Sequence, residues 1–207
     1  MILYQGVGAI QDLKDRYLTR LTGNGPSGCN TKIKEVYKAS VFTMLLGMTN
    51  SKCIKACCKP CPSRDEIFLF GHSRGGFIVR LVAGMLYHLH ALLLDPQNFD
   101  RAFQEGWGIY RAARSQSQLE QQRHSVLWFW KRHTRASAKI RFLGCFDTMK
   151  AFDDNDLNGV ALQSNVLHVR HALALPERAT ALSPERFHVA TQPTHDHTVL
   201  SYQEAWF

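Results

Sequence analysis

The sequence predicts an α/β protein with a mainly parallel sheet flanked by helices. Two short apolar runs suit buried strands, and segments with helical spacing of apolar residues lie between and after them. Strands that alternate with helices along a chain are typical of a layered, parallel sheet. The 207 residues are enough for one domain with a single buried core. We therefore expect residues 1–207 to belong to one domain.

The composition is that of a globular protein, with 45% hydrophobic and 20% charged residues. Lys and Arg number 25 against 17 Asp and Glu, a balance compatible with anionic partners. The basic residues are scattered and no zinc-finger spacing accompanies them, so we expect no nucleic-acid partner. No apolar run is long enough to predict a membrane span. The N-terminus lacks the residue order of a secretory signal, which favours a cytoplasmic location with reduced thiols.

The first expected helix follows a glycine-rich loop, Gly23–Gly28. Asn30 or Thr31 is expected to cap this helix, which would begin near Lys32. Its apolar face would consist of Ile33, Val36 and Tyr37.

Residues Ser40 to Cys61 form an atypical, cysteine-rich insertion with neither a sustained helical nor a sustained strand period. Four of the six cysteines lie in it: Cys53, Cys57, Cys58 and Cys61. Four thiolates are enough for zinc, but their spacing lacks two separated pairs, and adjacent cysteines fit tetrahedral ligation poorly. We therefore expect no metal and no cofactor. The segment is interpreted as a tolerated insertion or as translated intron sequence.

The next unit is a strand, a tight turn and a helix. The run Ile67–Phe70 is fully apolar and suits a buried strand. Glycines between Gly71 and Gly76 make a turn, and Phe77 to Leu93 carries apolar residues at helical spacing.

Four further segments complete the expected fold. Residues 97–135 are expected to be helical and cap-like, and their aromatic and basic patch at 128–132 suits contact with a lipid interface or burial under the cap. Lys139 to Phe146 suits a second buried strand, Asn165 to Leu175 suits a helix, and Ser201 to Phe207 suits the start of another strand.

A G-x-S-x-G motif, Gly71-His72-Ser73-Arg74-Gly75, lies between the predicted strand and helix. A buried strand before the motif and an apolar-faced helix after it are the context that a nucleophile elbow requires. Such a turn strains the serine backbone and exposes its hydroxyl above the sheet edge. The sequence therefore predicts an α/β-hydrolase-like fold with Ser73 as the nucleophile.

The neighbours of Ser73 have expected roles in this turn. Gly71 and Gly75 would let neighbouring backbone pass without a Cβ clash. The amide of Arg74 lies at the helix N-terminus and would donate one hydrogen bond to a tetrahedral oxyanion. The alternative interpretation is an ordinary glycine-rich turn between a strand and a helix.

A serine nucleophile needs a base, and the base needs an acid that orients it. Asp147 ends the second predicted strand, where parallel-sheet enzymes place active-site groups, so it is the candidate acid. The alternative is a helix N-cap or a turn aspartate. The histidines after Asp147 offer no base whose context singles it out: His168, His171, His188, His195 and His197. Of these, the first two are expected on a helix.

Several motifs together resemble one family. They are Tyr4–Gly8, Ile67–Leu86, Phe99–Arg111, Ile140–Thr148 and His171–Arg178. The family is the α/β-hydrolase domain, common in fungi and bacteria, that includes the type VI secretion phospholipase effectors (Tle-like catalytic domain). The chain is identified as a fungal-type, truncated member of it.

The resemblance implies that Ser73 is the nucleophile and Asp147 the acid of a serine hydrolase acting on an ester or phospholipid. It also implies an upstream Asp-Gly-Thr strand and a histidine in a Trp-Phe-Pro-Gly-x-His-x-Asp stretch. Trp206 and Phe207 match only the first two residues of that stretch. We therefore expect the domain to be incomplete at both ends and its activity to be impaired. The alternative is a non-catalytic α/β-hydrolase-like interaction module.

Overall fold

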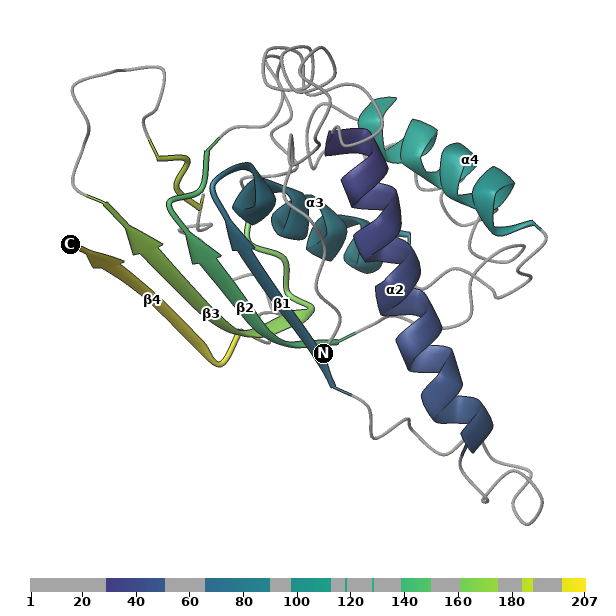
Figure 1. Ribbon diagram of the computed structural model, residues 1–207, viewed down its shortest axis with the longest axis horizontal. Helices are drawn as coiled ribbons and strands as arrows, with labels where there is room; N and C mark the ends of the chain where they lie inside the picture. The colour runs from purple at the N-terminus through teal and green to yellow at the C-terminus, as the bar shows by residue number, and fades with distance from the viewer. Residues whose placement is uncertain are drawn as a thin grey trace, which may run out of the picture.

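A computed structural model describes residues 29–50, 66–89, 98–112, 118, 128, 139–149, 161–174, 184–187 and 199–207. The elements follow in the order α2 (Cys29–Asn50), β1 (Ile67–His72), α3 (Arg74–His88), α4 (Phe99–Ala112), β2 (Ile140–Phe146), β3 (Val166–Leu173) and β4 (Ser201–Trp206). Figure 1 shows the four strands side by side, with α3 next to β1, α2 crossing in front of α3, and α4 farther from the sheet.

The sheet has the strand order β1-β2-β3-β4, and each neighbouring pair runs parallel. The predicted α/β class with a parallel sheet and flanking helices is therefore confirmed. Because all four strands run the same way, their carboxyl ends meet at one edge. In open α/β sheets this edge is where ligands bind.

One face of the sheet packs on α3. Along β1, Ile67 and Leu69 are buried, whereas Phe68 and Phe70 are 53% and 60% exposed. This alternation places successive side chains on opposite faces. On the α3 side, the thiol of Cys145 lies 3.9 Å from the carbonyl oxygen of Gly76. The core therefore lies between the sheet and α3, and it fixes the start of α3 against the end of β2.

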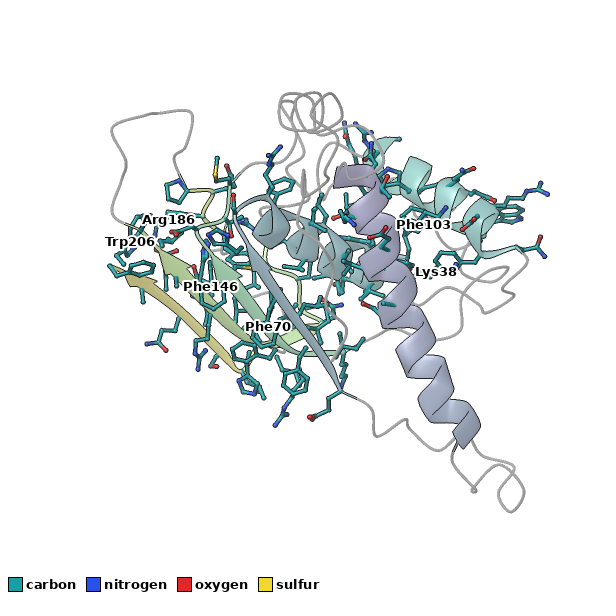
Figure 2. All side chains as sticks on the ribbon, viewed as in Figure 1. Lys38, Phe70, Phe103, Phe146, Arg186 and Trp206 are labelled. Atoms are coloured by element: carbon teal, nitrogen blue, oxygen red, sulfur yellow. The ribbon has the colours of Figure 1, made fainter. Side chains whose placement is uncertain are left out.

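The other two helices enlarge this core. On α2, Ile33 and Tyr37 are fully buried, as the predicted apolar face requires. The Tyr37 ring lies 5.6 Å from that of Phe103 on α4. Figure 2 shows Phe103 and Lys38 between these two helices. None of the described helices is long and apolar enough to cross a membrane.

The prediction of a helix at Asn165–Leu175 is wrong, because most of these residues form the strand β3. The buried apolar residues Val166, Val169 and Leu173 have spacings of three and four, which a helix also produces. Hydrogen bonding to strands on both sides decides the outcome, since β3 pairs with β2 and β4. His168 and His171 therefore lie on a strand instead of a helix.

Two other expectations change in detail. The first helix begins at Cys29, so Asn30 and Thr31 lie inside it and do not cap it. The same helix continues to Asn50 and so includes the first half of the cysteine-rich segment, for which no sustained helix was expected. Residues 51–65, which contain the four clustered cysteines, lie outside the described residues.

The cap-like region is described in part. Its helix α4 spans Phe99–Ala112, and Phe99 and Phe103 are buried. Trp128 is helical and 53% exposed, while the remaining residues of the aromatic and basic patch lie outside the described residues.

Candidate active site

Ser73 alone makes the turn between β1 and α3. The strand ends at His72 and the helix begins at Arg74. Ser73 has φ 56° and ψ −126°, a backbone conformation that non-glycine residues seldom adopt. Its amide donates to the carbonyl oxygen of Phe146 at 2.9 Å, which ties the turn to the end of β2. The expected strained serine turn is therefore present.

The Ser73 hydroxyl is not used to cap the helix. Ser73 occupies the N-cap position of α3 but makes no side-chain capping hydrogen bond. Its Oγ donates instead to Sδ of Met149 at 3.2 Å. Because sulfur is a weak acceptor, a stronger hydrogen-bond acceptor would readily replace it as the partner of the hydroxyl. Ser73 is half-buried at the carboxyl edge of the sheet.

The close backbone approach expected at two glycines is found at Gly71 and not at Gly75. A Cβ on Gly71 would overlap the carbonyl group of Gly75 and lie 2.6 Å from the amide nitrogen of Gly76. A Cβ on Gly75 would meet nothing within 4 Å. The second crowded glycine is Gly76, where a Cβ would lie 2.6 Å from Oγ1 of Thr148. The turn thus needs Gly71 and Gly76, because α3 starts directly against β1 and the end of β2.

Asp147 follows β2 directly, at the same sheet edge as Ser73. Its φ is 42°, which is again unusual for a residue with a side chain. Its amide donates to the carbonyl oxygen of Ala172 at 2.8 Å, and its Oδ1 accepts a short hydrogen bond from the amide of Ala174. The structure therefore places Ser73 and Asp147 at the same sheet edge, because both follow the ends of adjacent parallel strands, and Ser73 makes backbone hydrogen bonds to Phe146 and Met149.

Neither described histidine after Asp147 is bonded to Ser73. His171 is 1% exposed, and its Nε2 lies 3.1 Å from Oγ1 of Thr148. His168 lies on the opposite face of the sheet, where its Nδ1 is 2.9 Å from Oγ of Ser201. The other three, His188, His195 and His197, lie outside the described residues. The part of the chain that the structure describes therefore shows no base on the Ser73 hydroxyl.

A buried arginine on α3 holds a short segment beside the site. Arg80 is 2% exposed and donates to the carbonyl oxygens of Glu185 and Arg186 at 2.6 and 2.8 Å. Its guanidinium carbon lies 4.0 Å from the centre of the Phe187 ring. Burial lowers the pKa of Arg80 to about 10, so the side chain stays charged at neutral pH. Arg80 therefore anchors residues 184–187, whose Phe187 ring packs against His171 on β3 and Tyr202 on β4.

Glu204 on β4 is the centre of a cluster of polar side chains next to residues 184–187. The Glu204 carboxylate accepts hydrogen bonds from Arg186 at 2.8 Å, Tyr202 at 2.9 Å and Trp206 at 3.1 Å. Burial opposes ionisation of Glu204, but these hydrogen bonds outweigh it and hold its pKa below the usual value. Figure 2 shows Arg186 and Trp206 together at the end of β4. The cluster therefore keeps a carboxylate charged next to buried His171.

In the described ranges, no set of three His, Cys, Asp or Glu side chains is placed to hold a metal ion. Cys145 is fully buried, and burial raises the pKa of its thiol to about 12. A neutral thiol is a poor nucleophile and a poor metal ligand. Of the candidate catalytic residues, Ser73 and Asp147 both lie at this edge of the sheet.

Sequence reasoning missed three residues that contact the candidate site: Gly76, Thr148 and Met149. Thr148 and Met149 follow Asp147 directly, so their position after a strand end is the only sequence signal for them. Gly76 lies one residue past the G-x-S-x-G motif, and its only sequence signal is its place at the end of the glycine-bearing turn. Their importance depends on contacts between segments that are distant in sequence.

The sequence matches one protein family over residues 2–207, described as "T6SS, Phospholipase effector Tle1-like, catalytic domain". An uncharacterized protein of Saccharomyces cerevisiae, YEL023C, is 31% identical over 121 residues, which is 55% of this chain and 17% of the yeast protein. The chain thus spans less than a fifth of the length of that relative. No solved structure shows a significant match.

Proposed function

Because the chain belongs to the Tle1-like family of type VI secretion phospholipase effector catalytic domains, we propose that it hydrolyses phospholipid esters with Ser73 as its nucleophile. Membership of a phospholipase family suggests lipid hydrolase activity and a lipid substrate. The observation that carries the proposal is the conformation of Ser73, with φ 56° at a turn between a parallel strand and a buried helix. A strained serine at this position is the geometry of a nucleophile elbow.

In the proposed reaction, Oγ of Ser73 attacks the ester carbonyl carbon and forms a tetrahedral intermediate. The amide of Arg74, in the first turn of α3, stabilises the oxyanion together with the positive end of the helix. The Ser73 proton passes to a base, which returns it to the leaving oxygen as the intermediate collapses, so that an alcohol is released and an acyl-enzyme remains. Water then hydrolyses this ester by the same steps.

Asp147 is proposed as the acid that orients the base. Its amide and carboxylate are fixed by backbone groups of Ala172 and Ala174, so the carboxylate has one defined direction. A carboxylate held in this way stabilises an imidazolium without accepting its proton. The base itself is proposed to be a histidine outside the described residues, since His168 and His171 are bonded elsewhere.

A second candidate function is a non-catalytic interaction module, or an enzyme impaired in this chain. The observation that favours it is the bond from the Ser73 hydroxyl to the Met149 thioether in place of a histidine. Without a base the hydroxyl stays a weak nucleophile, and loss of one triad member lowers the rate by on the order of 10³-fold or more.

Hydrolysis of phospholipid vesicles distinguishes these functions. Vesicles of phosphatidylcholine and phosphatidylglycerol are incubated with the protein, and released fatty acid is measured. Ser73→Ala and Asp147→Asn are expected to abolish release, while Ser201→Ala is expected to preserve it. Ser201 is a matched control, because its hydroxyl is bonded to a histidine on the opposite face of the sheet. Equal release by wild type and Ser73→Ala would contradict the proposal, and no release by a folded wild type would favour the non-catalytic module.

A further inference from the structure

We propose that Thr148, held by His171, is the positioning residue that fixes the Asp147 carboxylate against the Ala174 amide, at the sheet edge where Ser73 lies. This inference rests on the proposed function, because it assigns Thr148 and His171 to the positioning of Asp147, the proposed acid. His171 would then serve the site through Thr148 and would not act as the base.

Thr148 fills the space between the start of α3 and β3. It is fully buried, and its Oγ1 lies against the bare Cα of Gly76. On the other side, the same Oγ1 lies 3.1 Å from Nε2 of His171. A hydroxyl can donate or accept, so this bond forms with either tautomer of the ring. Thr148 is therefore a hydrogen-bonded spacer between the helix that follows Ser73 and the strand that contains His171.

Backbone hydrogen bonds clamp the residues on both sides of Thr148. Its carbonyl oxygen accepts from the amide of Glu185 at 2.7 Å. The next amide, that of Met149, donates to the carbonyl oxygen of Ser73 at 3.1 Å. Asp147 has a positive φ, which costs on the order of 1 kcal/mol and persists only where the surroundings enforce it. The buried side chain of Thr148 is the part of this clamp that a mutation can remove.

His171 forms a hydrogen bond with Thr148, and its burial keeps the ring from exchanging protons with solvent. Its ring is buried, and the Phe187 ring lies edge-on to it at 5.3 Å. Its Nδ1 has no hydrogen-bond partner among the described residues and lies 4.0 Å from the Glu204 carboxylate. Burial, and then the charge of Arg80, lowers the pKa of His171 to about 4. The ring is therefore neutral at neutral pH, and Thr148 is its hydrogen-bond partner.

The experiment compares Thr148→Val, which replaces the hydroxyl by a methyl group, with Thr148→Ser, which keeps the hydroxyl. The first measurement is the NMR shift of the Ala174 amide, because that amide donates to Oδ1 of Asp147. The second is the rate at which a fluorophosphonate labels Ser73. Thr148→Val is expected to move the amide signal and slow labelling by about tenfold, the equivalent of one hydrogen bond. Thr148→Ser is expected to restore both.

Two further variants keep the test decisive. His171→Phe removes the same hydrogen bond from the other side, so it must move the Ala174 signal in the same direction even if Thr148→Val does not fold. Ser40→Ala is the matched control, because it deletes another buried hydroxyl bond, to the carbonyl oxygen of Val36 on α2. It is expected to lower stability without changing either measurement.

The outcomes separate the two proposals. A wild-type Ala174 signal in both Thr148→Val and His171→Phe overturns the positioning role, whatever the labelling shows. Wild-type labelling by Thr148→Val overturns it as well. A wild type that no fluorophosphonate labels contradicts the proposed function alone, because the NMR shifts still test the position of Asp147.

Discussion

Met149 contacts Ser73 twice: its Sδ accepts a hydrogen bond from the serine hydroxyl at 3.2 Å, and its amide donates to the serine carbonyl oxygen at 3.1 Å. The second contact is a backbone bond that any residue at this position can make. The first places a flexible, apolar side chain on the atom that is proposed to attack the substrate. We therefore expect the Met149 side chain to restrict access to the Ser73 hydroxyl.

Removing the Met149 side chain is expected to speed reaction at Ser73. Met149→Ala deletes both the cover and the sulfur acceptor, so fluorophosphonate labelling should be faster by about fivefold, the equivalent of about 1 kcal/mol. Met149→Leu keeps the cover and loses the acceptor, and it should label more slowly than Met149→Ala. Equal or slower labelling of Met149→Ala, relative to the wild type, would show that the thioether does not restrict the hydroxyl.

The two motif glycines are expected to differ sharply in their tolerance of alanine. Gly71→Ala forces a methyl group into the backbone of Gly75 and Gly76, so the free energy of unfolding should fall by about 3 kcal/mol or more. Gly75→Ala points into open space on a helix, so its effect should stay within about 1 kcal/mol and can be stabilising. Urea denaturation of the two variants measures the difference. Similar losses in both would contradict the geometry of the turn.

His171 should make the protein less stable in weak acid. Its pKa is about 4 in the folded state, lowered by burial and by Arg80 and Arg186 against the opposing charges of Glu204 and Asp147; its ordinary value is 6.5. Above pH 6.5 the ring is neutral in both the folded and the unfolded state, and its full contribution to the free energy of unfolding is present. As pH falls from 6.5 to 4, the unfolded chain binds a proton that the folded chain does not, so stability is lost.

The size of this loss is at most about 3 kcal/mol, and it stops below pH 4, where both states are protonated. Urea denaturation at several pH values between 7 and 4 measures it. His171→Phe cannot titrate, so its free energy of unfolding should change less across this range than that of the wild type. Parallel pH dependence in the two proteins would exclude a buried, neutral His171.

Arg80 is expected to hold residues 184–187 through its planar guanidinium. Arg80→Met leaves the carbonyl oxygens of Glu185 and Arg186 without these donors and should cost about 2–4 kcal/mol of folding free energy. Arg80→Lys keeps the charge, but a single ammonium lacks the fork that binds both carbonyls. It should therefore recover only part of the loss in thermal or urea denaturation. Full recovery with lysine would mean that charge, and not hydrogen-bond geometry, holds the segment.

The turn at Ser73 could be predicted because its signals are local. A continuous apolar run, the glycines and the helical spacing after them lie next to each other in sequence, and the structure has β1, the turn and α3 at these positions. The end of β2 at Asp147 was predictable for the same reason. In both cases the pattern of a single segment was enough.

The strand β3 and the crowded glycine could not be predicted in this way. Residues Val166, Val169 and Leu173 fit a helix as well as a strand until β2 and β4 are paired with them. Gly76 is needed because Thr148, from another segment, packs against its Cα. Met149 carries no chemical signal of an active site, because its role depends only on its distance from Ser73. Each of these features is a property of packing between segments.

Labelling with a fluorophosphonate, followed by mass spectrometry of the peptide that contains Ser73, tests the central claim most directly. The account predicts one phosphonyl adduct on Ser73 in the wild type and none in Ser73→Ala, while the control Ser201→Ala is labelled like the wild type. A folded wild type without the adduct, or an adduct that persists in Ser73→Ala, would contradict the assignment of Ser73 as the nucleophile.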